Sequence, residues 1–388
     1  MPVIQSILDN DLYKFTMQKA VLAYRRHVPV EYKFVNRRPE GKFNNDFAKA
    51  FAAEIRAMQS LCLSDDQREW LRNNLSWLGD EYLQFLGDYR FDPAEVIWSV
   101  DSGELKLTIE GDWERTILWE VPLMALISEL FFRHCDTAWA FDETDQRERL
   151  LEKGKILQDC QFSDFGTRRR RSFETHDLVV RTLKHLPGFQ GTSNVHLAHQ
   201  HQTNAIGTMA HEWIMGISAL EGLRHANRHA LRIWHGVYRG KLAIALTDTF
   251  GTGAFFNDFD ASLAPLFDGV RHDSGDPDSF AENVIKAYEE LGINPASRRI
   301  IFSDGLTPEK AAELQSRFAS RIGISFGIGT NLTNDFPGSP ALNMVVKLIR
   351  CDGVPVVKLS DVPSKAIGDR DALRVAHWTF FGKGLDSL

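Results

Sequence analysis

Cysteine is scarce in this chain, with four residues in 388, and no two of them form a CxxC pair. That spacing argues against a cysteine zinc site and against a disulfide framework, so we expect reduced core thiols. Long apolar runs are also missing. The most apolar stretch, residues 121–132, is too short to cross a bilayer and contains Glu129. The N-terminal segment is acidic rather than apolar, and a cytoplasmic protein is expected.

An excess of positive charge is likewise absent. The chain has 45 Lys and Arg against 52 Asp and Glu, a formal net charge of -7, which argues against a general nucleic-acid binder. No repeat, low-complexity tract or linker rich in proline and glycine is visible. With 43% hydrophobic and 25% charged residues the composition is that of a globular protein. The length predicts a domain of about 200 to 250 residues plus a smaller one.

The fold class follows from the order of apolar patterns. Residues 1–125 mix helical and strand-like stretches and predict a partner-facing N-terminal α+β domain. From Phe162 onward strand candidates alternate with helices, which predicts parallel βαβ units in residues 126–365, as a catalytic domain. An irregular (β/α) barrel of mostly parallel strands is favoured over a doubly wound sheet by the number of units. Residues 366–388 are expected to form a tail that packs back on the N-terminal domain. The strand candidates are residues 179–186, 242–249, 298–305, 321–330, 343–349 and 354–360.

Acidic residues follow several of these strand candidates. Asp248 lies in LTDT, Asp273 and Asp276 lie in RHDSGD, and Asp304 lies in SDG. Ligands gather at the carboxyl ends of parallel strands in either architecture. Carboxylates there suit ribose hydroxyls or hydrated Mg²⁺. Each turn alone is explained as an ordinary Asp or Gly turn, but the succession favours one shared site for a phosphorylated sugar and a metal ion.

The FGIGT turn adds a phosphate-binding candidate to this series. Gly327 and Gly329 would let the backbone approach a ligand closely. The amides of Gly329, Thr330 and Asn331 could form a nest for a phosphate monoester, although a lone GxGT is a weak signal.

Four consecutive arginines follow the strand-like residues 161–164. Arg168 comes after an aromatic residue and a glycine, and its planar guanidinium could bind a carboxylate or phosphate. Phe165 beside it could stack on a flat ring. For Arg169, Arg170 and Arg171 the favoured interpretation is a solvated basic helix start.

His211 opens a helix in GTMAHEWIMG, where a helix N-terminus would stabilise an added phosphoryl group. HExxM is not HExxH, so a metalloprotease is excluded. From these residues alone, a hydrogen-bonded structural histidine is the favoured interpretation. His199 and His201 lack a third metal ligand at useful spacing and are expected on a helix surface.

An ordered set of motifs resembles the nicotinate phosphoribosyltransferases, the type II phosphoribosyltransferases of NAD salvage. The matching motifs, in chain order, are DLYKFTM, DFGTRR, GTSNV, GTMAHEW, LTDTF, RHDSGD, SDGL and FGIGT. They extend over nearly the whole chain. The resemblance implies ATP-coupled formation of nicotinate mononucleotide and pyrophosphate from nicotinate and 5-phosphoribosyl 1-pyrophosphate, with ATP as co-substrate and Mg²⁺ as cofactor.

The resemblance also implies a role for each candidate residue. His211 is implied to be phosphorylated transiently, and Asp248 to orient it through the other ring nitrogen. Phe165 and Tyr13 are implied to sandwich the pyridine ring, with Tyr13 supplied by the partner subunit of a homodimer with shared sites. The remaining implied ligands are Arg168 and Arg271 for nicotinate, Asp273, Asp276 and Asp304 for ribose, Asp273 and Asp304 for Mg²⁺, and Gly329 with Thr330 for the 5′-phosphate.

Ser193 bears on which pyridine is used. In the related nicotinamide enzymes the turn matching GTSNV carries an acidic residue, whereas Ser193 is neutral. An aspartate there would repel a carboxylate and favour an amide, so the serine indicates nicotinate.

Several other classes of protein stay open on sequence alone. A nicotinamide- or quinolinate-type phosphoribosyltransferase would share most of these features. A barrel aldolase could use Lys241 or Lys347 as a Schiff-base lysine. A non-catalytic sugar-phosphate or nucleotide sensor would bind without turnover.

Overall fold

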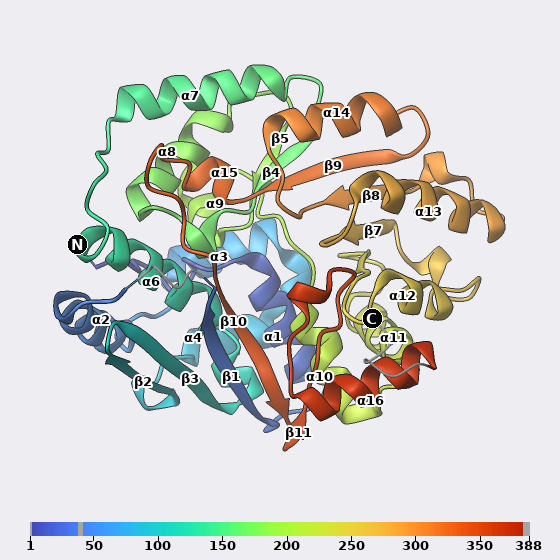
Figure 1. The fold of residues 1–388 in the computed structure, drawn as a ribbon, viewed down its shortest axis with the longest axis horizontal. Coiled ribbons are helices and arrows are strands. Elements are labelled where there is room, and N and C mark those ends of the chain that lie inside the picture. Colours follow the sequence, from blue (N-terminus) through green and yellow to red (C-terminus); the bar gives the residue numbers. More distant parts are fainter. Residues whose placement is uncertain (1, 38–41, 383–388) are drawn as a thin grey trace.

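The computed structural model describes residues 2–37 and 42–382, which contain two sheets (Figure 1). The first sheet has five strands in the order β11-β10-β1-β3-β2, and every neighbouring pair is antiparallel. A tight turn at Ser102 and Gly103, both with positive φ, joins β2 to β3. Its strands are β1 (Pro29–Asn36), β2 (Val96–Asp101), β3 (Glu104–Asp112), β10 (Met344–Cys351) and β11 (Val354–Pro355).

The second sheet has six strands in the order β5-β4-β9-β8-β7-β6, all parallel. This arrangement confirms the α/β class, because right-handed βαβ units place every strand end on the same edge. No ladder joins β5 to β6 within the described residues, so closure into a barrel stays a prediction. The strands are β4 (Phe162–Asp164), β5 (Phe189–Thr192), β6 (Ile244–Leu246), β7 (Gly269–His272), β8 (Arg299–Phe302) and β9 (Gly323–Ile328).

Most helices of the first half lie around the antiparallel sheet, whereas α7 packs on α8 (Phe173–Leu183) and α14 (Pro308–Phe318) of the second half (Figure 1). The central one, α6, is buried on all sides and contacts α2 and β10. An all-round apolar helix is stable only inside a core. These helices are α1 (Leu12–Tyr24), α2 (Asn45–Met58), α3 (Asp65–Asn74), α4 (Asp80–Asp88), α5 (Trp113–Thr116), α6 (Glu120–His134) and α7 (Glu143–Ile156).

Helices of the second half alternate with the parallel strands, as the sequence pattern predicted for residues 278–292 and 308–318. Several begin with a side-chain cap, such as Thr307, whose oxygen accepts from Lys310 N ahead of α14. The set comprises α8 (Phe173–Leu183), α9 (Val195–His201), α10 (His211–Glu221), α11 (Ala226–Tyr238), α12 (Thr252–Asp258), α13 (Pro277–Glu290), α14 (Pro308–Phe318), α15 (Thr330–Thr333) and α16 (Arg370–Phe381).

The prediction of parallel strands at residues 343–349 and 354–360 was wrong. Strand β10 pairs antiparallel with β1, with Val346 opposite Phe34 and Lys347 opposite Lys33. Most of β10 is buried on both faces, so its pattern imitates an interior parallel strand. A strand from the predicted catalytic segment therefore completes the N-terminal sheet and places its residues beside the cavity described below.

Residues 179–186 were predicted as a strand, but residues 173–183 form helix α8. The helix begins at a Ser172 cap whose hydroxyl accepts from Thr175 N at 3.1 Å. Val179 and Val180 are both buried. Their β-branched side chains favour strands only weakly, and helix packing overrides that preference.

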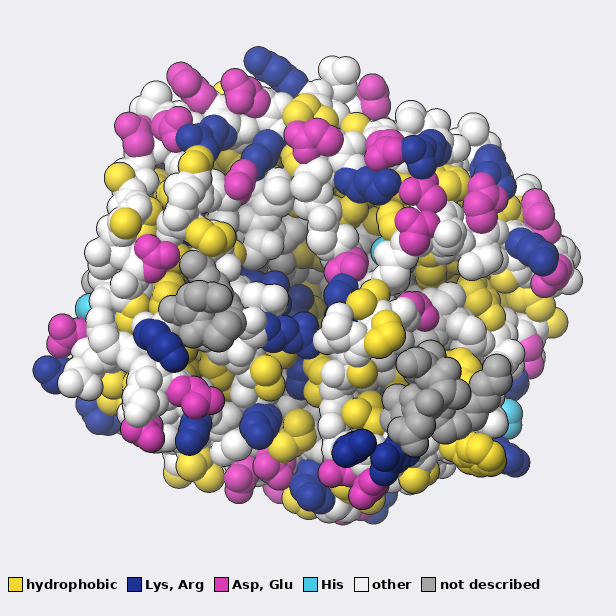
Figure 2. All heavy atoms as spheres, viewed as in Figure 1, with side chains coloured by type: hydrophobic (Ala, Val, Ile, Leu, Met, Phe, Trp, Pro, Cys, Tyr) yellow, Lys and Arg dark blue, Asp and Glu magenta, His cyan; other side chains and the backbone are white. Residues whose placement is uncertain are grey.

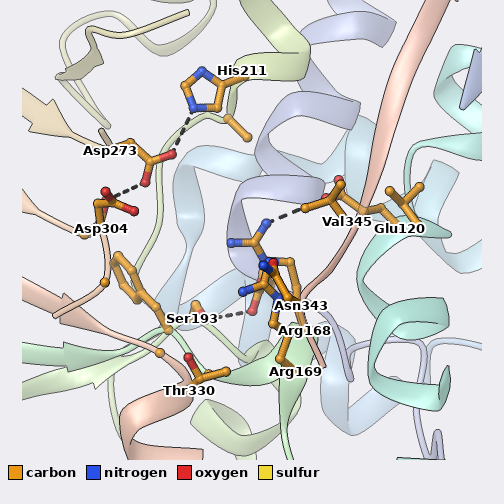
Figure 3. A pocket seen from close by; sticks show the side chains of 18 of the residues that line it. Glu120, Arg168, Arg169, Ser193, His211, Asp273, Asp304, Thr330, Asn343 and Val345 are labelled. Carbon is orange, nitrogen blue, oxygen red and sulfur yellow. Dashed lines mark hydrogen bonds and ion pairs between the residues drawn. The ribbon is translucent and has the colours of Figure 1, made fainter. Parts of the chain in front are cut away.

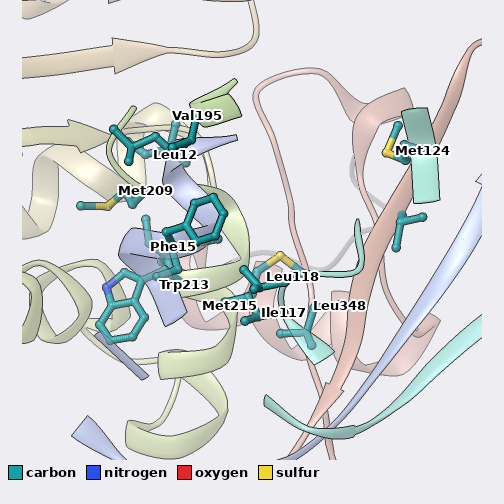
Figure 4. Packing of buried hydrophobic residues seen from close by; sticks show 14 of the residues in the cluster. Leu12, Phe15, Ile117, Leu118, Met124, Val195, Met209, Trp213, Met215 and Leu348 are labelled. Carbon is teal, nitrogen blue, oxygen red and sulfur yellow. The ribbon is translucent and has the colours of Figure 1, made fainter. Parts of the chain in front are cut away.

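A shared core holds the two sheets together. Figure 4 shows side chains of α1, α10 and β10, including Phe15, Trp213, Met215 and Leu348, gathered with Leu118. Each of them is at most 1% exposed. Close packing of this kind transmits position accurately, so α1 and α10 are held rigidly against β10. The start of α10, at His211, inherits that rigidity.

The C-terminal helix α16 lies beside α12 (Figure 1). Phe380 stacks on Phe250 with ring centroids 4.6 Å apart, and the rim of Phe381 reaches Gly251. The described ring contacts of the tail are thus with the catalytic half and not with the N-terminal segment on which we expected it to pack. Residues 383–388 of that predicted tail lie outside the described residues.

The four cysteines are free, as expected, but only Cys160 and Cys351 are buried, and Cys62 is exposed. Among the described residues, no helix is long and apolar enough to cross a membrane.

Candidate functional site

A cavity of about 660 Å³ opens between the carboxyl ends of the parallel strands and β10. Figure 2 shows it as a hollow with Lys and Arg side chains in its walls. Of the predicted site residues, ten line this cavity and two do not. Those that line it are Tyr13, Phe165, Arg168, Ser193, His211, Arg271, Asp273, Asp304, Gly329 and Thr330.

Successive strand ends place the acidic and glycine turns together, as predicted. Strand β7 ends at His272, one residue before Asp273, and β8 ends at Phe302, two residues before Asp304. Strand β9 ends one residue before Gly329. Because these strands are neighbours in a parallel sheet, their turns share one edge.

His211 is the first residue of α10, and both ring nitrogens have partners. Nδ1 lies 3.0 Å from Thr249 Oγ1, and Nε2 lies 2.9 Å from Asp273 Oδ2 (Figure 3). Lys358 Nζ lies 2.9 Å from the same Nε2. Burial, and then the charge of Lys358, lower the pKa of His211 to about 4. The ring is therefore neutral at pH 7.

Asp248 lies behind His211, outside the cavity lining, and is fully buried. The predicted contact through the other ring nitrogen was wrong, because Thr249 occupies Nδ1 and Asp248 Oδ1 lies 3.6 Å from Nε2. Its second oxygen pairs with Lys358 Nζ at 2.9 Å and accepts from Ser274 Oγ at 2.6 Å. Asp248 thus anchors the lysine that contacts His211.

These groups form a candidate cation site that does not suit a metal as it stands. Ligand atoms of His211, Asp248 and Asp273 lie within 4.8 Å of one another. The Lys358 ammonium contacts two of them, and its charge would repel a cation held there. A second such cluster in the described part of the chain, His27 with Asp112 and Glu114, lies away from the cavity.

Asp273 and Asp304 both face the cavity with fixed partners. Asp273 Oδ1 accepts from Ser303 Oγ at 2.9 Å. Burial acts to raise the pKa of Asp273, but the His211 hydrogen bond and the nearby Arg271 charge hold it well below its usual value. Asp304 receives Lys365 Nζ on both oxygens at 2.7 Å.

Asp276 does not reach the cavity. It is the N-cap of α13, where its carboxylate accepts from Ser279 N at 2.8 Å. The observed contacts of Asp276 are those of an ordinary turn residue, because its carboxylate caps a helix and satisfies an otherwise free amide.

Arg168 and Tyr13 line the opposite end of the cavity. Arg168 lies in a 3₁₀ turn after β4, and its Nη1 is 3.8 Å from Glu120 Oε1. Tyr13, on α1, lines the cavity of its own chain, and its supply to a partner's site in a dimer stays a prediction. The nearby Tyr13 and Glu120 groups raise the pKa of Arg168.

Ser193 carries a contact that the sequence argument did not include. Its hydroxyl donates to Asp11 Oδ1 at 2.7 Å, and both residues line the cavity. Burial raises the pKa of Asp11, while the Arg168 charge acts to lower it. An acidic group is therefore present beside the neutral serine.

A buried charge network stands behind this end of the cavity. The Lys14 ammonium, which is fully buried, pairs with Glu120 and Glu212. Glu212 also accepts from Trp113 Nε1 at 2.8 Å and from the Tyr32 hydroxyl at 2.5 Å. Since Glu212 follows His211 on α10, the network connects both ends of the cavity.

The expectation of solvated arginines at 169–171 was wrong. Arg170 is fully buried and donates to both oxygens of Asp9, at 2.7 and 2.8 Å. Arg171 is also buried, with its guanidinium 3.5 Å from the centroid of the Phe132 ring. Arg169 donates to Met344 O, at 2.8 Å from Nη2. These arginines join the strand end to surrounding elements.

Phe165 lies directly against Gly327. A Cβ added at Gly327 would come within 2.2 Å of the Phe165 ring, so only glycine leaves room for it. We expected a ligand to approach the backbone of Gly327 closely, but the Phe165 ring does so instead. This contact orients the Phe165 ring, which lines the cavity.

Gly327→Ala is expected to lower the free energy of unfolding by about 1–3 kcal/mol, because the Phe165 ring must move to admit the methyl group. Denaturant unfolding measures this change. Gly236→Ala is the matched control, since a Cβ there meets nothing within 4 Å and lies in a helix, where alanine is favoured. Equal stability of the two variants would contradict the packing argument.

Several cavity residues were missed by sequence reasoning. Lys358 lies in the segment 354–360 that was interpreted only as a strand, and Lys365 follows that segment without an assigned role, although two lysines flanking the Ser-Asp turn are a usable signal. Asp11 was not singled out from the sequence; it precedes α1 and makes no side-chain cap bond. Glu120, which lines the cavity, and Thr249, which contacts the His211 ring from outside the lining, carry no local signal. His199 and His201 pair with Asp66 and Asp177 away from the cavity.

Comparison with known proteins agrees with the geometry. Residues 8–128 match the model of the nicotinate phosphoribosyltransferase N-terminal domain, and residues 160–383 match that of the nicotinate phosphoribosyltransferase family. The chain is 48% identical to a nicotinate phosphoribosyltransferase of Methanosarcina acetivorans, over 99% of this chain and 100% of that protein. A crystal structure of nicotinate phosphoribosyltransferase from Porphyromonas gingivalis superposes with a TM-score of 0.93 at 42% identity, covering 97% of this chain and 100% of that one. The chain therefore belongs to the nicotinate phosphoribosyltransferase family.

Proposed function

We propose that this protein joins nicotinate to 5-phosphoribosyl 1-pyrophosphate, giving nicotinate mononucleotide and pyrophosphate, in a reaction coupled to ATP through transient phosphorylation of His211. The observation that carries the proposal is one cavity with Arg168 and Tyr13 at one end and a neutral His211 at the other. About 660 Å³ is enough for a pyridine ring and a sugar phosphate.

The transfer needs positioning more than proton transfer. The lone pair of the pyridine nitrogen forms the new bond to C1 of the sugar. The C1–oxygen bond breaks, and its electrons leave with pyrophosphate. Arg168 would hold the carboxylate and Phe165 the ring face. Lys365 and Lys358 offer positive charge for the phosphate oxygens. Arg271, which the resemblance assigned to nicotinate, is proposed for the phosphate oxygens instead, because its charge acts on Asp273. The strand-end turn at Gly329 and Thr330 would take the 5′-phosphate.

Mg²⁺ is proposed at the Asp273 and Asp304 carboxylates. Both are partly open to the cavity, with side chains 28% and 32% exposed, and Mg²⁺ commonly takes one or two carboxylates together with substrate phosphate oxygens. When bound it would neutralise the charge of the departing pyrophosphate. Asp304 would then exchange its Lys365 contact for the metal.

Phosphoryl acceptance requires an unprotonated ring nitrogen. Phosphoryl acceptance at Nε2 would use the tautomer with the ring proton on Nδ1, donating to Thr249 Oγ1. In that tautomer Nε2 accepts from Lys358 and gives up its hydrogen bond to Asp273. The ammonium would then face the added phosphoryl oxygens. Coupling follows only if the phosphorylated and free forms bind substrates and products with different affinities.

Incorporation of labelled phosphate from ATP into His211 is expected to be nearly constant between pH 6 and pH 8. The lowered pKa, about 4, keeps the ring unprotonated across that range, and the acid limb should begin only well below an ordinary histidine value of about 6.5. A pH series of rapid-quench labelling measures it. A half-maximal point near pH 6.5 would contradict the argument from burial and Lys358.

The activity itself is tested by product formation with nicotinate or nicotinamide, each with and without ATP. Nicotinate mononucleotide formation stimulated by ATP is expected. Efficient use of nicotinamide would favour a nicotinamide-type enzyme, for which the Asp11 carboxylate beside Ser193 is the specific observation. Turnover of quinolinate would instead indicate a quinolinate-type enzyme, and binding without turnover would indicate a sugar-phosphate or nucleotide sensor.

Assembly and location are proposed from the resemblance. A homodimer is proposed from the family alone. Tyr13 lines the cavity of its own chain and so gives no separate support for a partner subunit. Closure of the parallel sheet into a barrel and a cytoplasmic location are proposed on the same basis.

A further inference from the structure

Lys347 is the cavity lysine that the proposed chemistry has not used. Three lysines line the cavity, and two have partners: Lys358 contacts His211 and Asp248, and Lys365 contacts Asp304. The Lys347 ammonium makes no hydrogen bond or ion pair with any residue in 2–37 or 42–382.

The position of Lys347 is set by β10, which forms the wall facing the parallel strand ends. Lys347 lies opposite Lys33 of β1, and the ladder between β1 and β10 fixes its main chain. Lys347 is half-buried and lines the cavity, whereas Lys33 is exposed and does not. Opposite residues share one face of a sheet, and of these two lysines only Lys347 reaches the cavity.

The two largest charge effects on Lys347 come from the Arg168 end of the cavity. Glu120 of α6 attracts it, and Arg168, after β4, repels it. Lys358 also repels it, and Asp273, at the end of β7, attracts it more weakly. Burial and the two cations lower the pKa of Lys347 to about 8. An ammonium in this setting gains most from an added anion, because Glu120 is already shared with Lys14 and Arg168.

We infer that Lys347 is a second cationic ligand of the pyridine carboxylate, acting beside Arg168 to select a negatively charged ring over its neutral amide. This inference rests on the proposed function. Two cations offset the acidic Asp11 and Glu120 in the same part of the cavity, which alone would favour the amide. Ser193 replaces only one acidic residue of the related nicotinamide enzymes, and Asp11 and Glu120 remain. The selection of nicotinate therefore needs the positive charge of Lys347.

The test compares Lys347→Gln with Lys347→Arg in the full chain. For Lys347→Gln, KM for nicotinate is expected to rise roughly 10- to 100-fold, the usual worth of a charge-assisted contact, while KM for phosphoribosyl pyrophosphate changes less than about threefold. Lys347→Arg should recover most of the nicotinate affinity. Lys33→Gln, on the facing strand, should change neither constant, and thermal unfolding of each variant checks the fold.

A pH profile adds a readout that a structural role would not move. Above about pH 8 the wild-type ammonium loses its proton, so KM for nicotinate should rise between pH 7.5 and 9 by roughly tenfold per unit at the steepest. Lys347→Arg should stay flat there. Equilibrium titration with nicotinate alone should show the same trend without turnover.

The outcomes separate this inference from the proposed function. If the wild type turns over nicotinate but Lys347→Gln keeps its nicotinate KM, the inference is wrong and the function stands. If KM for phosphoribosyl pyrophosphate rises instead, Lys347 binds the leaving group and the inference is again wrong. A wild type without nicotinate turnover would overturn the function itself.

Discussion

His211→Asn is expected to keep slow transferase activity and to lose all stimulation by ATP. Asparagine can still hydrogen bond near Thr249 and Asp273, which lie 3.0 and 2.9 Å from the ring nitrogens, but it offers no nitrogen that accepts a phosphoryl group. The transfer step itself uses the pyridine nitrogen as nucleophile, so it persists. Initial rates with and without ATP, and labelled phosphate on the protein, measure the two effects.

His199→Asn is the matched control for this prediction. His199, on α9, pairs with Asp66 at 3.0 Å and does not line the cavity. It should keep both phosphate labelling and stimulation by ATP. Stimulation that survives in His211→Asn would rule out the assignment of the phosphorylated residue.

Arg170→Met should lower the free energy of unfolding by about 3–5 kcal/mol at pH 7, the largest stability effect that we predict. Asp9 and Arg170 are both fully buried, and removal of the guanidinium leaves the carboxylate without its two charged hydrogen bonds. Asn194 Nδ2, at 2.8 Å, would remain as a donor to Asp9. Urea unfolding measures the change.

The pH dependence of this loss follows from the direction of the Asp9 pKa. In the wild type, burial acts to raise that pKa, but Arg170 brings it below its ordinary value. The stability from this pair is thus present above about pH 4 and lost as pH falls through the lowered value. Without Arg170, burial raises the pKa of Asp9 against the weaker effect of the Asn194 hydrogen bond, and protonation of Asp9 relieves the cost. The difference between variant and wild type should therefore shrink from pH 7 to pH 4.

A surface pair gives the control for this stability test. Arg321 pairs with Glu282 at 2.5 Å, and their side chains are 44% and 54% exposed. Arg321→Met should change stability by less than about 1 kcal/mol, because exposed ion pairs contribute little. The double variant Arg170→Met with Asp9→Asn should regain part of the lost stability. An equal loss in both arginine variants would contradict the burial argument.

The strand ends show why sequence reasoning worked where it did. Asp273, Asp304 and Gly329 each follow a short apolar run, and the βαβ pattern requires all such runs to end on one edge. That inference needs only local patterns and chain connectivity. Asp276 shows its limit, since a turn residue next to two site residues proved to be a helix cap.

Residue partners across the chain could not be predicted in the same way. Lys358 contacts His211 across 147 residues, and Arg170 contacts Asp9 across 161. A local pattern reports whether a side chain is polar, not which distant group meets it. For that reason Arg170 was expected in solvent, and Thr249 was not expected at the His211 ring.

By itself the sequence determined the α/β class, the order of the family motifs and the common edge on which most candidate residues meet, because these depend on apolar periodicity and connectivity. Only the tertiary structure decided that β10 closes the cavity from the N-terminal sheet, with Lys347 on its wall. It also decided that Lys358 lies against His211 and that Tyr13 faces its own chain's cavity. Strand pairing and buried charge pairing depend on which surfaces exclude water together, and this is a property of the whole packed chain.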